Sequence, residues 1–316
     1  MEKKKNDFIA QGSILAIASI LVRVMGMIYR IPMTAIIGDK GNGFYSYAYS
    51  VYTILLLLSS YSLPLAVSKM VSAKAQLGQW RNVKRVFICA IAFAIGIGTT
   101  FGLIVLIGAQ FFTRVFFHSE LAAIALRFMA PTILIMALLG VFRGFFQGLQ
   151  NTLPTAVSQI VEGLINAIMS VVFAYFLFDF GHGMDAAGGT TDLGYAWGAA
   201  GGAIGTGAGA LAGLIFCFIL FVAYRKILAV NISRDKTGTQ QEYGDIFRLM
   251  LSIALPVILS TALYNLIELV DGSLFNNIMA SKGMEDVKDS MWGAYNAKAL
   301  LLVHIPVSIS SAMAVS

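Results

Sequence analysis

Charge, cysteine and proline are all scarce in this sequence. Asp, Glu, Lys and Arg make up only 12% of the 316 residues, about half the share found in soluble domains. A chain so poor in charge cannot cover a soluble globular fold, so that class is excluded. The two cysteines, Cys89 and Cys217, lie in apolar stretches without a ligand or disulfide motif. Neither a disulfide framework nor a metal site is therefore expected.

The sequence also lacks the motifs of enzymes that use nucleotides or a nucleophilic serine. It has no glycine-rich phosphate loop and no nucleophile elbow, and its three histidines, at 118, 182 and 304, are dispersed. The polar linkers are at most about 20 residues long, which is too short for a soluble catalytic domain. We expect a protein that is not an enzyme and that carries no cofactor.

Long apolar stretches dominate what is present. Hydrophobic residues make up 58% of the chain, the mean hydropathy is +0.79, and the 31 glycines suit close packing of helices in lipid. A window of about 20 residues, the length of a helix that crosses a bilayer, predicts an all-α polytopic membrane protein with eight helices. Their approximate limits are 8–37, 44–67, 85–112, 119–145, 153–178, 195–224, 244–276 and 291–316.

The distribution of basic residues predicts the orientation of these helices. The N-terminus and every second linker are rich in Lys and Arg, whereas the linker 178–194 has aspartates and no basic residue. By the positive-inside rule the N-terminus is cytoplasmic and the helices alternate from there. The net charge of +6 is then an orientation signal, and no nucleic-acid partner is expected. The residues counted as cytoplasmic are Lys3, Lys4, Lys5, Lys69, Lys74, Arg81, Lys84, Arg85, Arg143, Arg225, Lys226, Arg234, Lys236 and Arg248.

A weak internal repeat predicts how the helices are grouped. The second predicted helix begins with Gly-Phe-Tyr at 43–45 and ends with Ala-Val-Ser at 66–68; the eighth begins with Gly-Ala-Tyr at 293–295 and ends with Ala-Val-Ser at 314–316. Repeated bundles are common in secondary transporters, with the site at the repeat interface. The interpretation is a six-helix lobe over 1–226, a cytoplasmic linker over 227–243, and the first two helices of a second, truncated lobe over 244–316.

Two arginines, Arg23 and Arg30, interrupt the first apolar stretch. An arginine at mid-bilayer costs about 3 kcal/mol or more, so each one needs a reason. Seven residues are nearly two helical turns, so both side chains lie on the same face. The hypothesis is a cationic cavity wall that binds an anionic substrate group, and the guanidinium fork suits phosphate in particular. For Arg30, which is close to the outer interface, snorkelling is the alternative.

The predicted fifth helix carries a continuous polar stripe. Ser158, Glu162, Asn166 and Ser170 recur every four residues, and a polar stripe in lipid must face protein or water. Glu162 is a candidate counter-ion for the two arginines or a gating residue. The alternative is a structural hydrogen bond between helices.

Two further groups of polar residues lie in predicted helices. In the seventh, Asn265, Glu268 and Asp271 follow one another at steps of three residues and could bind a cation or pair with a basic residue such as Lys298 of the eighth helix. A salt bridge that locks one conformation is the alternative. The second helix has a side rich in hydroxyl groups, which can contact sugars, although packing between helices is favoured. That side contains Ser46, Ser50, Thr53 and Ser60, with Tyr45, Tyr49 and Tyr52 beside it.

Three segments, in order along the chain, resemble one family. They are RVMGMIYRIPMTAIIGDKGNGFYSYAYSVYTILL at 23–56 followed by LPLAVSKMVS, then RGFFQGLQNTLPTAVSQIVEGLINA at 143–167, then LIELVDGSLF at 266–275. These resemble the polysaccharide-biosynthesis flippases of the stage V sporulation protein B type, which are similar to MurJ-like lipid II flippases. The resemblance covers essentially the whole chain, and the second segment is its most specific part.

The resemblance implies a fold and a function. The family belongs to the multidrug/oligosaccharidyl-lipid/polysaccharide (MOP) exporter superfamily, whose members have two lobes around a central cavity in the bacterial cytoplasmic membrane. It implies transport of lipid-linked oligosaccharides, such as peptidoglycan precursors, from the inner to the outer leaflet. Arg23 and Arg30 fall in the region that lines the cationic cavity, and Lys298 would suit it too. The implied partners are the lipid-linked glycan and the bilayer, with cell-wall synthesis proteins as further candidates.

Two other functions remain open from the sequence. A cation-coupled multidrug exporter of the same superfamily would have acidic residues in the first-lobe cavity, whereas the first helix carries arginines. A membrane scaffold that recruits cell-wall synthases would leave Arg23 and the polar stripe unexplained.

Overall fold

The computed structural model describes residues 2–188 and 192–300, without the side chains of 2–12, 61, 187–188, 264 and 268. All regular structure in this part of the chain is helical. The elements are α1 (Glu2–Ile28), α2 (Arg30–Leu56), the π-helical η1 (Leu57–Tyr61), α3 (Leu63–Gln76), α4 (Trp80–Phe117), α5 (Ala122–Gly148), α6 (Leu153–Gly188), α7 (Leu193–Ser233), α8 (Tyr243–Ser281), α9 (Glu285–Ala294) and the π-helical η2 (Tyr295–Ala299).

The first predicted helix corresponds to α1 plus the start of α2. Hydrogen bonds of the helical pattern cross the boundary at Tyr29, from Tyr29 N–H to the Met25 carbonyl and from Met33 N–H to the Tyr29 carbonyl. The real break comes at Gly38, whose φ of 63° and ψ of −176° are not helical. Only glycine adopts this conformation readily, so the chain turns there and the helix resumes at Asp39.

The polar linkers are much shorter than the sequence predicts. The predicted linkers 68–85, 178–194 and 225–243 shrink because α3 continues to Gln76, α6 to Gly188 and α7 to Ser233. A hydropathy window detects only the part of a helix that matches the bilayer, and these helices extend beyond it. In the described part of the chain, six helical segments are long and apolar enough to span a membrane, and the stretch Ser13–Ile28 of α1 is a shorter apolar one. In the predicted eighth helix, 291–316, residues 301–316 lie outside the described part.

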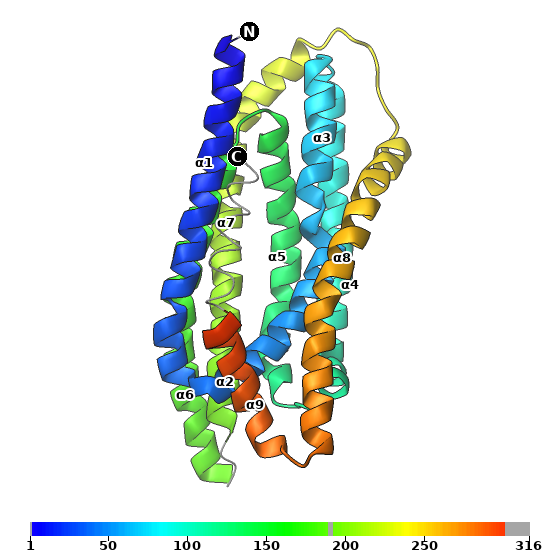
Figure 1. The fold of residues 1–316 in the computed structure, drawn as a ribbon. Helices are drawn as coiled ribbons and strands as arrows, with labels where there is room; N and C mark the ends of the chain where they lie inside the picture. The colour runs from blue at the N-terminus through cyan, green and yellow to red at the C-terminus, as the bar shows by residue number, and fades with distance from the viewer. Residues whose placement is uncertain (1, 189–191, 301–316) are drawn as a thin grey trace.

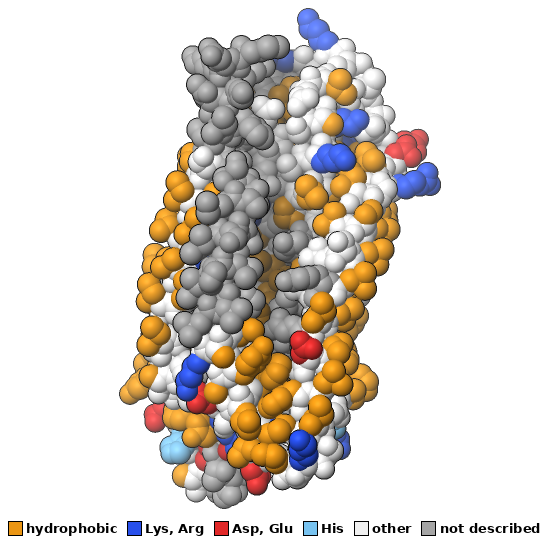
Figure 2. All heavy atoms as spheres, viewed as in Figure 1, with side chains coloured by type: hydrophobic (Ala, Val, Ile, Leu, Met, Phe, Trp, Pro, Cys, Tyr) orange, Lys and Arg blue, Asp and Glu red, His pale blue; other side chains and the backbone are white. Residues whose placement is uncertain are grey.

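The helices form an elongated bundle in which α2 and α5 are central (Figure 1). More than half of the apolar window is buried in the α2–α3 segment (59%) and in α5 (56%), against 22% or less in α4, α6, α7 and α8. The outer four therefore present most of the lipid-facing surface. On the face shown in Figure 2, apolar side chains cover the middle and most charged side chains lie toward the two ends, as expected of a bundle that spans a membrane.

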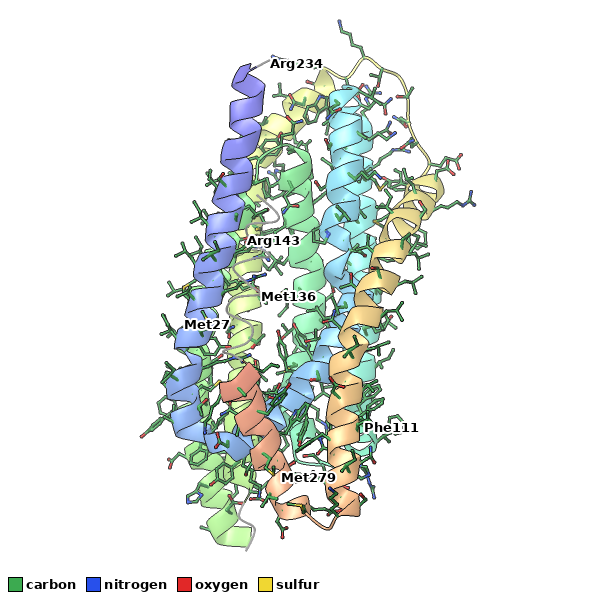
Figure 3. The ribbon with its side chains drawn as sticks, in the orientation of Figure 1. Met27, Phe111, Met136, Arg143, Arg234 and Met279 are labelled. Carbon is green, nitrogen blue, oxygen red and sulfur yellow. The ribbon has the colours of Figure 1, made fainter. Side chains whose placement is uncertain are left out.

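The two ends of the bundle differ, and we name them by what they hold. The N-terminus of α1 and the segment 234–242 between α7 and α8 lie at one end, called the linker end. Helix α9 lies at the other, called the α9 end (Figure 1). In Figure 3, Arg234 is at the linker end, Met279 is at the α9 end, and Arg143 of α5 lies between them.

The segment 234–242 is bound to the start of α4 by polar side chains. The Asp235 carboxylate accepts hydrogen bonds from the Arg81 N–H at 2.9 Å and from the Thr237 N–H and hydroxyl at 2.9 and 2.6 Å. The fully buried Asn82 side chain donates to the Thr239 carbonyl and accepts from the Gln241 N–H. These contacts hold the segment against the first turn of α4, where unpaired backbone N–H groups favour a carboxylate.

We expect replacement of Asp235 by asparagine to loosen this segment. The N–H donors lower the pKa of Asp235 to about 2, so its stabilising contribution is complete above the unfolded value near 4 and is lost as pH falls through 2. Trypsin should cleave at Arg234 and Lys236 several times faster in Asp235→Asn than in the native protein at neutral pH.

The control is Asp245→Asn, which changes an exposed carboxylate in the first turn of α8. It should leave the cleavage rate unchanged. The difference in melting temperature between the native protein and Asp235→Asn should persist down to about pH 4 and vanish toward pH 2. A pH-independent difference would contradict the role of the ionised carboxylate.

Candidate functional site

Arg23 of α1 and Arg30, the first residue of α2, lie on one flank of the helix that runs continuously through Tyr29. The most exposed ridge of α1 is apolar and includes Ile17 (58% exposed) and Ile28 (61% exposed), while Ala18 on another side is buried. At 100° per residue, Arg23 lies about 130° from the centre of that ridge. Arg30 shares this flank because the helix continues through Tyr29. Arg23 is itself exposed and Arg30 is half-buried, and both lie on a flank other than the apolar ridge.

A polar network joins α5 to α6. The Arg143 guanidinium donates from Nη2 to Glu162 Oε2 at 2.6 Å and from Nε to Ser158 Oγ at 2.8 Å. One turn along α5, Gln147 Nε2 donates to Thr155 Oγ1 at 3.3 Å. The exposed fractions of the Arg143 and Glu162 side chains are only 11% and 25%. A charge-assisted pair of this geometry, shielded from water, holds the two helices in register.

The partner of Glu162 is thus Arg143, which sequence reasoning missed. Arg143 is one of the basic residues that the sequence predicts on the cytoplasmic side, and its side chain lies within the bundle. The contact is the interhelical bond that the sequence left as an alternative to pairing with Arg23 or Arg30. The sequence does contain a signal for this pairing. Arg143 and Gln147 lie one helical turn apart before the turn that joins α5 to α6, and their partners Thr155, Ser158 and Glu162 follow that turn at similar spacing.

The remainder of the polar stripe packs against α7. Ser170 Oγ donates to Asn166 Oδ1 at 2.8 Å and contacts the Gly202 carbonyl at 3.2 Å. Glycines recur along the facing side of α7, and a Cβ on Gly205 or Gly209 would collide with the α6 backbone. The small residues let the two backbones approach closely, so Asn166 and Ser170 serve this interface.

Among the described side chains, Asn265 and Asp271 of α8 are not paired with Lys298. The Asn265 side-chain amide donates to the Thr261 carbonyl of its own helix at 2.8 Å, and Asp271 is exposed. The side chain of Glu268 lies outside the described residues. Lys298 of η2 instead binds Asp39 of α2, with Nζ 2.8 Å from both carboxylate oxygens.

Contacts between the start of the chain and its last described helices close the α9 end. Besides Lys298 with Asp39, the Tyr47 hydroxyl donates to Asn276 Oδ1 of α8 at 2.9 Å. Lys288 of α9 donates to the His118 carbonyl at the C-terminus of α4 at 2.9 Å, where helix carbonyls favour a cation. Around these bonds, the Trp292 ring stacks on Tyr47.

Two glycines allow the closest approach at this end. A Cβ on Gly293 of α9 would collide with the Asp39 carbonyl and the Gly43 nitrogen, and a Cβ on Gly43 would collide with the Asp289 carbonyl. Asp39 and Asp289 each precede their glycine by four residues. The contact is therefore reciprocal, and it joins the two positions, 43 and 293, at which the sequence repeat begins.

Among the described residues, no group of three His, Cys, Asp or Glu side chains is placed to hold a metal ion.

Comparison with known proteins defines the class. Solved structures of MOP-superfamily transporters share the fold. A MOP-superfamily transporter from Pyrococcus furiosus has 16% identity and a TM-score of 0.59, over 96% of this chain and 64% of that one. An outward-facing multidrug-resistance MATE transporter has 15% identity and a TM-score of 0.61, over 96% and 62% of the two chains. The chain is an all-α, multi-pass membrane protein with the MOP fold.

The family follows from a second comparison. The model of the polysaccharide biosynthesis protein family matches residues 8–316, and the chain belongs to that family. Two relatives from Bacillus subtilis (strain 168) are the lipid II flippase MurJ, with 26% identity over 95% of this chain, and stage V sporulation protein B, with 25% identity over 97%. The chain spans about half the length of these relatives, 55% and 56% respectively.

Proposed function

We propose that the protein containing this chain translocates a lipid-linked oligosaccharide from the inner to the outer leaflet of the bacterial cytoplasmic membrane. The pyrophosphate and sugars enter a cavity between two helical lobes, and the lipid tail stays in the bilayer. The observation that carries the proposal is the position of Arg23: a cation within an apolar helix, on a flank away from the lipid-suited ridge, in a chain of the polysaccharide biosynthesis family. The name of one relative, the lipid II flippase MurJ, supports the same substrate class.

The contacts at the α9 end support an alternating-access mechanism. Asp39–Lys298, Tyr47–Asn276 and the crossing of Gly43 with Gly293 join α2 to the helices of the second predicted lobe. Exposed ion pairs of this kind are weak individually and can break and re-form in a transport cycle. With the N-terminus in the cytoplasm, these contacts form the outer gate, and the substrate enters from the inner leaflet.

The arginine flank distinguishes this function from cation-coupled drug export. A drug exporter for cationic compounds needs a free carboxylate in the first-lobe cavity, and the carboxylate of Glu162 is engaged by Arg143. An anionic headgroup matches the two cations of the first helix instead.

Replacement of Arg23 tests the proposal. The assay uses proteoliposomes that contain the full-length protein. Arg23→Ala should reduce translocation of a lipid-linked oligosaccharide at least tenfold, because a charge-assisted hydrogen bond to phosphate is lost (about 1.5–3 kcal/mol). Arg23→Lys keeps the charge and should retain part of the activity. Leu21→Ala, on the exposed apolar ridge, is the control for insertion and should be fully active.

Full translocation by Arg23→Ala, at equal membrane insertion, would exclude this site. Export of cationic dyes by the native protein, with no translocation of the lipid-linked substrate, would favour the drug exporter. Cell-wall defects caused by changes in 68–85, with Arg23→Ala harmless, would favour the scaffold.

A further inference from the structure

One aromatic side chain of the central helix α2 is unusually accessible. The side chains of residues 41–60 are all described, and among them only Tyr49 is exposed (38%). Helix α2 contacts α4, α5, α6, α7, α8 and α9, so these neighbours surround it. An exposed aromatic side chain is unusual on a helix that packs against so many others, whereas on an outer helix it is common because such a helix faces lipid.

The contrast with another exposed tyrosine supports this placement. Tyr175 of α6 is 61% exposed and lies in a ridge with Leu164, Ile168 and Val172, all exposed and spaced at three or four residues. That pattern is typical of a lipid-facing helix side. Tyr49 has no such ridge, because the residues one turn away on either side, Tyr45 and Tyr52, are buried at 9% and 2%.

The ring of Tyr49 is held firmly by its neighbours. It stacks on Tyr45, with centroids 5.8 Å apart and planes inclined at 18°, and contacts Tyr52 at 5.9 Å and 45°. Tyr45 in turn lies 3.4 Å from the Thr206 hydroxyl of α7. A ring held by two neighbouring rings and still 38% exposed presents a rigid aromatic surface to a ligand.

The nearby hydroxyl groups differ in their availability. Ser46 and Ser50 donate to carbonyls one turn back, those of Asn42 and Ser46, so they are used within the helix. Thr53, one turn after Tyr49 and on the same side of α2, has a buried hydroxyl with no hydrogen-bond partner among the described residues. A buried polar atom without a partner costs free energy, so a ligand hydroxyl that reached Thr53 would satisfy it.

We propose that Tyr49 is a sugar-binding residue: its ring stacks on the apolar C–H face of the first sugar of the lipid-linked glycan, and Thr53 binds a sugar hydroxyl. This assignment rests on the proposed function, in which Arg23 and Arg30 bind the pyrophosphate next to that sugar. It makes Tyr49 a determinant of specificity for glycosylated lipid over the bare lipid pyrophosphate.

The test compares two probes, a polyprenyl pyrophosphate that carries a disaccharide and the same lipid pyrophosphate without sugar. Binding is measured by fluorescence titration of the full-length protein in lipid nanodiscs. Tyr49→Leu, which keeps apolar volume but loses the ring, should weaken binding of the glycosylated probe about three- to tenfold, the range expected for one aromatic contact. Binding of the sugar-free probe should change less than twofold.

Two variants control for the ring and for folding. Tyr49→Phe retains the stacking surface and should bind both probes like the native protein. Tyr175→Leu removes an exposed tyrosine from the lipid-facing ridge and should also bind both normally.

Each outcome decides between the two proposals. Equal weakening of both probes by Tyr49→Leu, or no weakening of the glycosylated probe, overturns the sugar contact and leaves the proposed function intact. Failure of the native protein to bind either probe overturns both. Should Tyr49→Leu not fold, loss of glycosylated-probe selectivity in Thr53→Val supports the sugar contact, and unchanged selectivity overturns it.

Discussion

Replacing Arg143 with methionine is expected to lower the free energy of unfolding by about 3 kcal/mol, because it leaves the Glu162 carboxylate unpaired within the bundle. Arg143 supplies both the 2.6 Å bond to Glu162 and the 2.8 Å bond to Ser158, and methionine preserves the apolar volume while removing both donors. The measurement is the midpoint of denaturant unfolding in mild detergent, followed by helical circular dichroism.

The double variant Arg143→Met with Glu162→Gln separates two contributions to the free energy of unfolding, the cost of an unpaired charge and the net stabilisation by the ion pair. Glutamine is neutral, so the double variant should recover most of the lost stability. The matched control is Arg114→Met, which breaks the ion pair with Glu120 at 3.5 Å; both side chains are mainly exposed, 72% and 56%, so the change should cost less than about 0.5 kcal/mol. Wild-type stability of Arg143→Met would contradict the assignment of a structural pair.

Activity of the double variant also decides the role of Glu162. A double variant that folds stably and translocates substrate normally assigns the pair to structure alone. A stable variant without translocation assigns it to the transport cycle, as the gating hypothesis for Glu162 requires.

Replacing Gly293 with alanine is expected to separate α9 from α2. The added Cβ would overlap the Asp39 carbonyl and the Gly43 nitrogen, and backbone atoms cannot move aside as a flexible side chain can. Overpacking of this kind costs about 1–3 kcal/mol or more, which the exposed Lys298–Asp39 pair cannot offset. The α9 end should therefore open.

Trp292 reports this opening directly. It is buried (5% exposed) and stacks on Tyr47, so with Trp80 and Trp197 replaced by phenylalanine it is the single tryptophan of this chain. In that background Gly293→Ala should shift the emission of Trp292 to longer wavelength and increase its quenching by acrylamide several-fold.

The control for Gly293→Ala is a glycine with free space around it. A Cβ on Gly26 of α1 would meet nothing within 4 Å, so Gly26→Ala should leave the quenching of Trp292 unchanged and stabilise the helix by up to about 1 kcal/mol. Unchanged quenching in Gly293→Ala would show that the glycine contact does not hold the α9 end closed.

Some features could be predicted from the sequence because they depend on local pattern. The apolar stretches predicted helices, and the glycine at position 38 ended the first of them, as its positive φ requires. The seven-residue spacing of Arg23 and Arg30 placed them on one flank because the helix runs through Tyr29. The positions of the linkers could not be predicted as well, since hydropathy measures the match to lipid and not the end of the hydrogen-bonded helix.

The side-chain pairs that join different helices could not be predicted from the sequence. Periodicity showed that Glu162 must face something polar, but α1 and α5 both offered an arginine, and only the packing of α5 on α6 selected Arg143. In the same way Lys298 had candidate partners on α8, and the crossing of α2 with α9 assigned Asp39 instead.

By itself, then, the sequence determined the membrane-spanning class, the helices and the side of each helix that is polar, because these follow from hydropathy and a 3.6-residue repeat. Only the tertiary structure decided that Arg143 neutralises Glu162, that Gly43 meets Gly293, and that Tyr49 is partly exposed while Tyr45 and Tyr52 are buried. Each depends on the rotation and depth of one helix against another, which are determined by the packing of distant side chains.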